Sequence, residues 1–247
     1  MQHPSFSVYA LDPIGIVHSC YREKFGIPRQ PGLATAATAF IELLPPYNRP
    51  EAVQGLDGFS HLWLQFIFHQ TLAEGWRPTI RPPRLGGEAR VGVFANRSTH
   101  RPNGLGLSVV KLKGIDTRDG KVIIELEGSD LLDGTPIVDI KPYLPWADAV
   151  TDAQCGFAPE PPLKRDVRFT QDAVLSCQHY ESSTGRPLQT LVIQVLSQDP
   201  RPAYLHRRPG RSHGIQLWDQ NIRWQANDDH FLVTDIKPVE LLHESTA

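Results

Sequence analysis

The sequence predicts a mainly β protein with few helices, and three observations support this prediction. Leucine and phenylalanine recur at every second position through residues 62–68, which is the period of a strand, and the other face of this strand is mixed. The segment DTRDG at residues 116–120 separates two apolar runs and is typical of a hairpin turn. Proline and glycine interrupt the chain between apolar runs, as in PRQPG at residues 28–32, and exclude a continuous helix there.

The N-terminal part is expected to contain two strands. The first lies at residues 6–9 or at residues 14–18, and both placements are open. Residues 35–44, TAATAFIELL, fit a helix or a strand; we favour a strand because PPYNRP follows at once. Residues 51–55 are expected to form a short helical turn.

Residues 58–70, GFSHLWLQFIFHQ, predict the clearest strand of the chain. Alternate residues from Leu62 to Phe68 share one apolar face. His69 and Gln70 follow at the end of this strand, where side chains commonly enter a binding pocket. A buried structural role is an equal alternative for His69.

Residues 90–111, RVGVFANRSTHRPNGLGLSVVK, place a polar loop between two apolar runs. The loop supplies hydrogen-bond donors and acceptors from Asn96 to Asn103, and a loop of this kind usually recognises a ligand. A solvated hairpin loop is the alternative. The residues expected at buried strand positions are Val91, Val93, Phe94, Leu105, Leu107, Val109 and Val110.

Residues 111–115 and 121–126 are expected to pair across the hairpin turn. The segment SDLLDGTPIVDIKPY at residues 129–143 then predicts a turn at Asp133 followed by a strand on which Asp139 and Lys141 share a face. A surface salt bridge is the ordinary explanation for such a pair. We expect this face to be covered, because the bulky segment PYLPW follows it.

The chain changes character after Ala149, where a proline-rich and weakly patterned stretch begins. We divide the chain into a domain of residues 1–150, a linker of residues 151–165 and a small α+β domain of residues 166–247. That second domain is expected to contain one helix and three short strands. They are placed near residues 189–196, 215–218, 222–224 and 231–233.

Composition limits the class of protein. The chain has 247 residues, of which 40% are hydrophobic and 21% charged, as in a globular protein with a sizeable core. It contains no apolar run of membrane-spanning length and no signal-peptide pattern at its N-terminus, so we expect a cytoplasmic protein without a membrane partner. The three cysteines are scattered and never form CxxC, which argues against a disulfide framework and against a metal site.

Two basic segments stand out against the net charge of −2. Arginine is the cation in both, which suits bidentate contact with the phosphates of a short, folded polyanion. Pairing of these arginines with carboxylates elsewhere in the chain is the alternative. The first segment contains Arg77, Arg81, Arg84 and Arg90 against Glu88, and the second contains Arg201, Arg207, Arg208 and Arg211 against Asp199.

Several familiar site motifs are absent. The chain has no GxxxxGK[ST] phosphate loop and no HExxH zinc helix. GFSHL at residues 58–62 lacks the second glycine of the nucleophile elbow GxSxG. GLG at residues 104–106 lies between predicted strands, so it does not support a Rossmann site.

Five longer motifs do occur, in order along the chain. They are FGIPRQPG (residues 25–32), GFSHLWLQFIFHQ (58–70), RPPRLGG (81–87), GVFANRSTHRPNGLGLS (92–108) and DLLDGTPIVDIKPYLP (130–145). Together they resemble the TsaA-like family, and DPRPAY at residues 199–204 extends the resemblance to the C-terminal part. The resemblance implies a homodimeric, S-adenosylmethionine-dependent methyltransferase with a β-barrel in place of a Rossmann fold. It also implies a substrate, N6 of the threonylcarbamoyladenosine beside the tRNA anticodon.

The resemblance also implies a cofactor pocket. Carried over residue by residue, the pocket for S-adenosylmethionine consists of Pro28, Arg29, Gln30, His69, Gln70, Arg97, Leu107, Asp133, Gly134, Thr135 and Pro136. His100 and Gly104 stand where the family motif has phenylalanine and proline. This difference concerns the rigidity of the loop and its contacts with substrate, and it leaves the expected cofactor pocket unchanged.

Methyl transfer requires mainly the alignment of amine, methyl carbon and sulfur, because the sulfonium is already a good leaving group. A hydrogen-bond acceptor on the amino protons would help to localise the nitrogen lone pair. Strand placement suggests Asp139 as this acceptor and Tyr143 as a stacking or hydrogen-bonding wall. The predicted substrate contacts are Arg101, Asn103, Lys141, Arg201, Arg207 and Arg208, the last three on the backbone of the anticodon stem. A packing or dimer role for DPRPAY, with solvated arginines after it, is the alternative.

Two other classes of function remain open from the sequence. A non-catalytic protein that binds adenosylmethionine or RNA would keep the pocket without transferring a methyl group. A hydrolase that uses His69 and Asp139 would turn over without adenosylmethionine. Labelled methyl transfer to tRNA that carries the threonylcarbamoyl group distinguishes all three classes.

Overall fold

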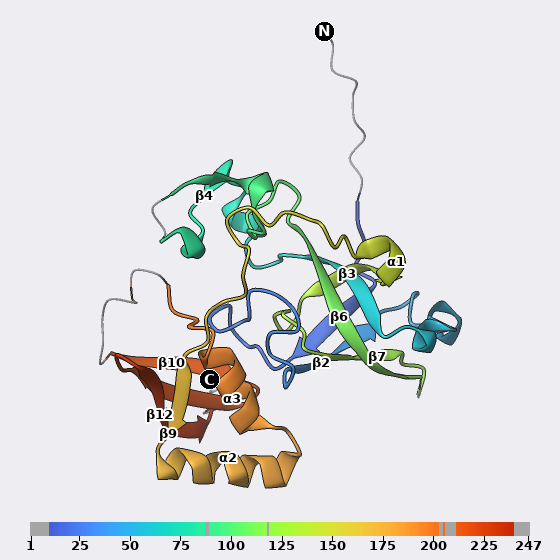
Figure 1. The fold of residues 1–247 in the computed structure, drawn as a ribbon. Helices are drawn as coiled ribbons and strands as arrows, with labels where there is room; N and C mark the ends of the chain where they lie inside the picture. The colour runs from blue at the N-terminus through green and yellow to red at the C-terminus, as the bar shows by residue number, and fades with distance from the viewer. Residues whose placement is uncertain (1–9, 87–88, 118, 203–204, 206–210, 240–247) are drawn as a thin grey trace, which may run out of the picture.

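The computed structural model describes the chain except residues 1–9, 87–88, 118, 203–204, 206–210 and 240–247 (Figure 1). The alternative first strand at residues 6–9 lies outside the described residues. Six antiparallel strands form a closed barrel in the order β1-β2-β7-β6-β3-β8, and β1 closes it by pairing Gly15 with Ile137 of β8. The strands are β1 (Gly15–Ser19), β2 (Thr38–Leu43), β3 (His61–Ile67), β6 (Leu105–Asp116), β7 (Ile123–Glu127) and β8 (Pro136–Pro142). The predicted mainly β fold with a barrel is confirmed.

The core of the barrel follows from the alternation seen in the sequence. Leu62, Leu64 and Phe66 of β3 point inward and are buried, and they pack with apolar residues of the other five strands. Gly106 of β6 lies opposite Phe66. Only glycine fits at this position, because a Cβ atom there would lie 2.3 Å from the phenylalanine ring. The predicted helical turn after β2 is present as a 3-10 helix, η1 (Pro50–Val53), and η2 (Leu56–Gly58) follows it.

The long segment between β3 and β6 differs from its prediction. The predicted strand from residue 91 is only two residues long: β5 (Val91–Gly92) pairs with β4 (Thr79–Ile80) in a small separate sheet. The chain then turns into the 3-10 helix η5 (Val93–Ala95), so Phe94 is 76% exposed instead of buried. Leu107 is 55% exposed because Gly106 and Ser108 occupy the inward positions of β6. Two further 3-10 helices are η3 (Leu72–Glu74) and η4 (Pro83–Leu85).

The C-terminal unit is a four-stranded sheet in the order β10-β11-β12-β9, with α2 and α3 beside it in Figure 1. Its predicted helix and three strands are present as α3 and β10 to β12, whereas α2 and β9 were not predicted. Helix α2 is mostly polar and buries only Ala173, Cys177 and Tyr180, so its apolar stripe is weak. Strand β9 pairs in parallel with β12, which is distant in sequence. The bounds are α1 (Pro145–Asp148, beside the barrel), β9 (Asp166–Phe169), α2 (Gln171–Thr184), α3 (Leu188–Leu196), β10 (Ser212–Leu217), β11 (Gln220–Ala226) and β12 (His230–Pro238).

The segment between β1 and β2, residues 20–37, connects the barrel to the core of the C-terminal unit. Cys20 and Tyr21 are buried in that core. Trp218 N donates to Cys20 O at 2.8 Å. Gly26 packs so closely on Ile215 that a Cβ atom would lie 1.9 Å from Ile215 Cδ1. The C-terminal unit therefore holds in place the segment that carries the candidate cofactor residues 28–30.

Candidate active site at one end of the barrel

Antiparallel topology brings three loops to the same end of the barrel. Strands β1, β3 and β7 end where β2, β6 and β8 begin, so residues 20–37, 68–104 and 128–135 all leave the barrel at this side. We call it the loop end of the barrel. Every residue of the predicted cofactor pocket belongs to these loops or, as Leu107 and Pro136 do, to the first residues of the adjoining strands. Whether they bind the cofactor stays a prediction, but the fold gathers them in one place.

The turn at Asp133 is fixed against β1. The carboxylate of Asp133 accepts from Ser19 N at 2.9 Å and forms an ion pair with Arg22. Gly134 adopts φ of 77°, a conformation that favours glycine, and its N–H donates to Val17 O at 2.8 Å. The side chain of Thr135 donates to Leu132 O at 2.7 Å. The DGTP turn therefore has a single well-supported backbone conformation.

Arg97 connects two of the three loops. Its guanidinium donates to the side-chain oxygen of Gln30, so the predicted cofactor residues of segments 20–37 and 68–104 are in direct contact. Arg97 also lies close enough to Asp130 for its positive charge to oppose the rise in that carboxyl's pKa. Gln30, Arg97 and Asp130, which come from three different loops, thus lie near one another.

Asp130 is a carboxyl group that the motif analysis did not single out. Ser108 Oγ donates to it at 2.7 Å, yet burial raises its pKa from the ordinary 3.8 to about 6, against the opposing effects of Ser108 and Arg97. A carboxyl group perturbed in this way is typical of a functional site. Its position inside the DLLDGTP motif, three residues before Asp133, was the available signal.

We expect the Asp130→Asn variant to be more stable than the wild type at pH 8, by up to about 3 kcal/mol. The raised pKa means that the folded protein binds the proton more tightly than the unfolded chain, so unfolding free energy falls as pH rises from 3.8 to about 6. Asparagine can still accept from Ser108 and carries no such penalty. Urea unfolding at pH 8 and pH 4.5 measures the difference, which should shrink at the lower pH. An equal difference at both values would contradict a buried, titrating Asp130.

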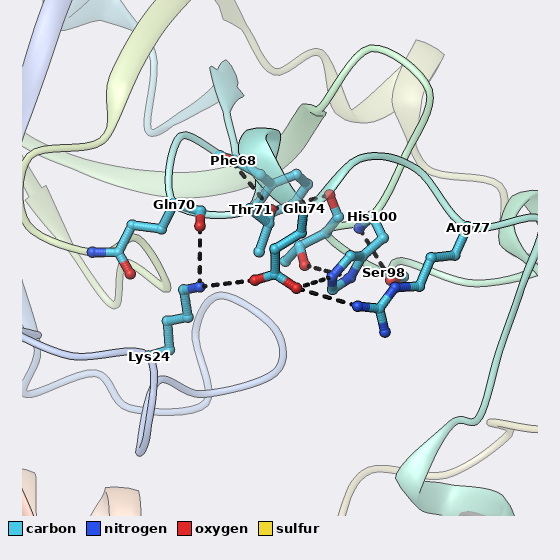
Figure 2. Close-up of polar contacts among 9 residues, drawn as sticks. Lys24, Phe68, Gln70, Thr71, Glu74, Arg77, Ser98 and His100 are labelled. Atoms are coloured by element: carbon cyan, nitrogen blue, oxygen red, sulfur yellow. Dashed lines mark hydrogen bonds and ion pairs between the residues drawn. The ribbon is translucent and has the colours of Figure 1, made fainter.

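Glu74 joins the loops by a cluster of polar contacts that was not expected from the sequence (Figure 2). Its carboxylate lies 3.0 Å from His100 Nε2, 3.3 Å from Arg77 Nη2 and 3.9 Å from Lys24 Nζ. The hydrogen bond with His100 lowers the pKa of Glu74. Lys24 also donates to Gln70 O at 3.4 Å. Two of its partners belong to the same loop as Glu74, and Lys24 comes from the loop of residues 20–37. No local pattern in TLAEGW marks the contacts with Lys24 and His100, because both residues are distant in the sequence.

His100 and Gly104, which differ from the family motif, are accommodated by these contacts. The His100 ring binds Glu74, and its backbone N–H donates to Ser98 Oγ at 3.2 Å. Gly104 adopts φ of 60°, which a proline cannot adopt. Its N–H donates to Arg101 O at 3.1 Å. In this chain, polar contacts therefore hold the loop at the position where the family motif has a proline that restricts the backbone directly.

The predicted substrate contacts are distributed differently. Arg101 donates to Val93 O at 3.2 Å and to Asn96 O at 2.8 Å, so it shapes the loop, while Asn103 is exposed beside it. Arg207 and Arg208 lie outside the described residues. Arg201 is 1% exposed, and its Nε and Nη2 donate to Asp199 at 2.7 and 2.8 Å. The prediction that Arg201 contacts RNA phosphate is wrong, because its guanidinium is buried in the C-terminal unit.

Asp139 lies on the outer face of the barrel, in one cross-strand row with Gln65 and Leu107. Its side chain is 44% exposed, and Oδ2 lies 3.3 Å from Gln65 Nε2 and 3.8 Å from Lys141 Nζ. The expectation that the following segment covers this face is wrong, since Trp146 turns outward and is itself exposed. Tyr143 packs against Trp63 with ring centroids 5.8 Å apart. Asp139 on β8 and Tyr143 immediately after it are both partly exposed.

A pocket of about 250 Å³ lies between residues 24–29 and the C-terminal unit. Of the predicted cofactor residues only Pro28 and Arg29 line it. It is therefore distinct from the surface around Arg97 and Leu107. In the described part of the chain, no three His, Cys, Asp or Glu side chains are grouped as metal ligands would be. Among the same residues, no helix is long and apolar enough to cross a membrane.

Comparison with known proteins decides the family. The profile of the tRNA-methyltransferase O N-terminal domain matches residues 16–149, and that of the TrmO C-terminal domain matches residues 162–239. The chain belongs to the TrmO family. The resemblance inferred from the five sequence motifs is thereby confirmed.

Individual relatives are similar to this chain over nearly their whole length. The tRNA (adenine(37)-N6)-methyltransferase of Escherichia coli K12 is 47% identical over 235 residues, which are 94% of this chain and 99% of that protein. A putative S-adenosylmethionine-dependent methyltransferase, RcsF, of Pseudomonas aeruginosa is 50% identical over 226 residues, 87% of this chain and 92% of the relative. The crystal structure of TrmO from Pseudomonas aeruginosa superposes with a TM-score of 0.80 at 42% identity, covering 94% and 99% of the two chains.

Proposed function

We propose that this protein is an S-adenosylmethionine-dependent methyltransferase that methylates N6 of threonylcarbamoyladenosine next to the tRNA anticodon. The observation that carries the proposal is the match to TrmO proteins across both parts of the chain, including one named for methylation of adenine 37 N6. The barrel supports it, because its loop end gathers the residues that the resemblance assigns to the cofactor.

The side chains at the loop end fit the chemical groups of adenosylmethionine. Arg97 and Gln30 offer charged and amide donors for a carboxylate, and Asp133 offers an acceptor for hydroxyl or ammonium groups. Leu107 presents an exposed apolar surface that suits an adenine ring. Bound there, the cofactor supplies an activated methyl group on a sulfonium leaving group.

The remaining task of the protein is to orient the adenine amine and to accept hydrogen bonds from its protons. Asp139 is proposed for this role, because it belongs to the same cross-strand row as Leu107, with Gln65 between them. Strands in a sheet lie about 5 Å apart, so the row places Asp139 about 10 Å from Leu107. Lys141 Nζ lies 3.8 Å from the carboxylate and Tyr143 packs against Trp63; both residues are proposed to hold the substrate base.

The function is tested by incubating the protein with labelled adenosylmethionine and tRNA that carries the threonylcarbamoyl group. We expect label in that tRNA and none in tRNA that lacks the group. Binding of adenosylmethionine without transfer would indicate a non-catalytic binding protein. Turnover without adenosylmethionine would indicate a hydrolase.

The Asp139→Asn variant is expected to bind adenosylmethionine as the wild type does and to turn over about 100-fold more slowly, the lower range for loss of an acid–base group. The amide retains the shape of the side chain and loses the charge that attracts the amino protons. Calorimetry and single-turnover methyl transfer measure the two properties separately. Intact turnover would give Asp139 a structural role.

Other features of the protein are proposed from the resemblance and from the sequence pattern. They are a homodimer, a cytoplasmic location, and a division into a catalytic barrel of residues 1–150, a linker of residues 151–165 and a C-terminal domain. Arg207 and Arg208 remain proposed contacts to the anticodon stem. Their double alanine variant should weaken tRNA binding and its salt dependence without changing adenosylmethionine affinity.

A further inference from the structure

The described residues between 76 and 95 form a small projection that completes neither core, and we call this segment the flap. Within the described part of the chain, its strands β4 and β5 pair only with each other, and in Figure 1 they stand away from the barrel and from the C-terminal sheet. None of its described residues belongs to either of the two buried clusters. A two-stranded sheet is only marginally stable by itself, so packing of the fold does not explain why the flap is present.

The surface of the flap combines aromatic rings with arginines. Trp76 is 55% exposed, and Phe94 at the other end of the flap is still more exposed. Arg77, Arg81 and Arg90 are exposed as well. The sequence of the flap contains four arginines and a single acidic residue, Glu88, which lies outside the described part of the chain. Large exposed aromatic side chains beside unbalanced positive charge indicate a binding surface for a polyanion with planar groups.

Phe94 is held in a defined position close to the loop end of the barrel. The guanidinium of Arg101 lies 5.9 Å from the centroid of the Phe94 ring and donates to the carbonyls of Val93 and Asn96 on either side of it. Phe94 also precedes Arg97, the residue that contacts Gln30, by three positions. A base stacked on Phe94 would therefore lie near the residues proposed to bind the cofactor.

The root of the flap is attached to the same loop end. Arg77 N donates to His100 O at 3.2 Å, and Val93 N donates to Pro78 O at 3.0 Å. Figure 2 shows the side chain of Arg77 reaching Glu74 beside His100. These contacts orient the flap relative to the loop end, which a surface that delivers a substrate requires.

We propose that the flap binds the single-stranded anticodon loop of the substrate RNA, with a base next to the target nucleotide stacked on Phe94 and loop phosphates bound by Arg81 and Arg90. This inference rests on the proposed function. Unpaired bases stack on aromatic rings, and arginine binds phosphate, so the chemistry of the flap matches a nucleic-acid loop. Contact between the flaps of two copies of this chain is less favourable, because it would bring their positive charges together.

Three variants test the proposal, with a fluorescent RNA hairpin of the anticodon stem-loop as the probe. Phe94→Ala is expected to weaken hairpin binding about 5- to 100-fold, and Phe94→Tyr is expected to retain it, because the ring remains. The Arg81→Ala/Arg90→Ala variant should lower affinity and reduce the dependence of log Kd on log salt by about 2. It should leave adenosylmethionine affinity unchanged.

Matched controls lie after β2, toward the opposite end of the barrel. Tyr47 and Arg49 are both exposed there. Tyr47→Ala and Arg49→Ala should leave hairpin affinity and its salt dependence as in the wild type. All variants are compared at 50 and 200 mM salt, with thermal unfolding to verify that they are folded and light scattering to determine their assembly state.

The outcomes separate this inference from the proposed function. Wild-type affinity and salt dependence in folded Phe94→Ala and Arg81→Ala/Arg90→Ala, together with methyl transfer by the wild type, would exclude the flap and leave the function intact. Hairpin binding that depends on Phe94, without methyl transfer by the wild type, would support the surface and overturn the function. Loss of assembly in Phe94→Ala, with hairpin affinity unchanged, would assign the flap to contact between copies of the chain.

Discussion

Replacement of Arg201 by alanine is expected to lower the free energy of unfolding by about 3–5 kcal/mol. The guanidinium of Arg201 is buried, binds the carboxylate of Asp199 through two nitrogens, and lies 5.0 Å from the centroid of the Phe231 ring. Alanine would leave a cavity beside Phe231 and a carboxylate without its closest charge partner. Removal of one member of a buried ion pair is costly because the other loses both water and its counterion.

Arg168→Ala is the matched control for this prediction. Arg168 belongs to the same unit and forms an ion pair with Asp166 at 2.8 Å, but both side chains are exposed, so its loss should cost less than about 1 kcal/mol. Urea unfolding of the two variants and the wild type measures the difference. Loss of tRNA affinity by Arg201→Ala at wild-type stability would contradict a structural role.

Replacement of Arg97 by alanine is expected to weaken adenosylmethionine binding about 10- to 150-fold, which corresponds to a charge-assisted contact of about 1.5–3 kcal/mol. Arg97 is the side chain that joins Gln30 of one loop to the vicinity of Asp130 in another. Its loss would remove a contact with the cofactor and leave Gln30 less restrained. Calorimetric titration of the folded variant with adenosylmethionine measures the effect.

Arg90→Ala provides the comparison for Arg97→Ala. Arg90 is an exposed arginine of the flap whose Nη1 lies 3.5 Å from Thr79 Oγ1, and it has no proposed contact with the cofactor. The Arg90→Ala variant should bind adenosylmethionine with the same affinity as the wild type. Equal affinity in Arg97→Ala as well would exclude Arg97 from the cofactor pocket.

The errors in the predicted elements have local causes. The spacing of apolar residues along the sequence correctly predicted β3. The same reasoning wrongly placed Phe94 in a strand, because no strong turn residue after Gly92 marks the point where the chain turns into η5. Helix α2 was missed because a mostly polar helix carries little periodic signal. Arg201 was predicted to contact RNA phosphate because the sequence shows its charge. The sequence does not show that its side chain is buried beside Asp199.

The sequence by itself determined the class of this protein and much of its local structure. Period-two alternation indicated strands, and ordered motifs identified the family and the residues to place in a pocket, because these properties depend on residue type and short spacing. Only the tertiary structure decided which loops meet. Closure of the barrel by β1 and β8, the pairing of β9 with β12, and the contacts of Glu74 with Lys24 and His100 all join residues distant in the chain. Such contacts depend on how the whole chain folds, so no local sequence pattern predicts them.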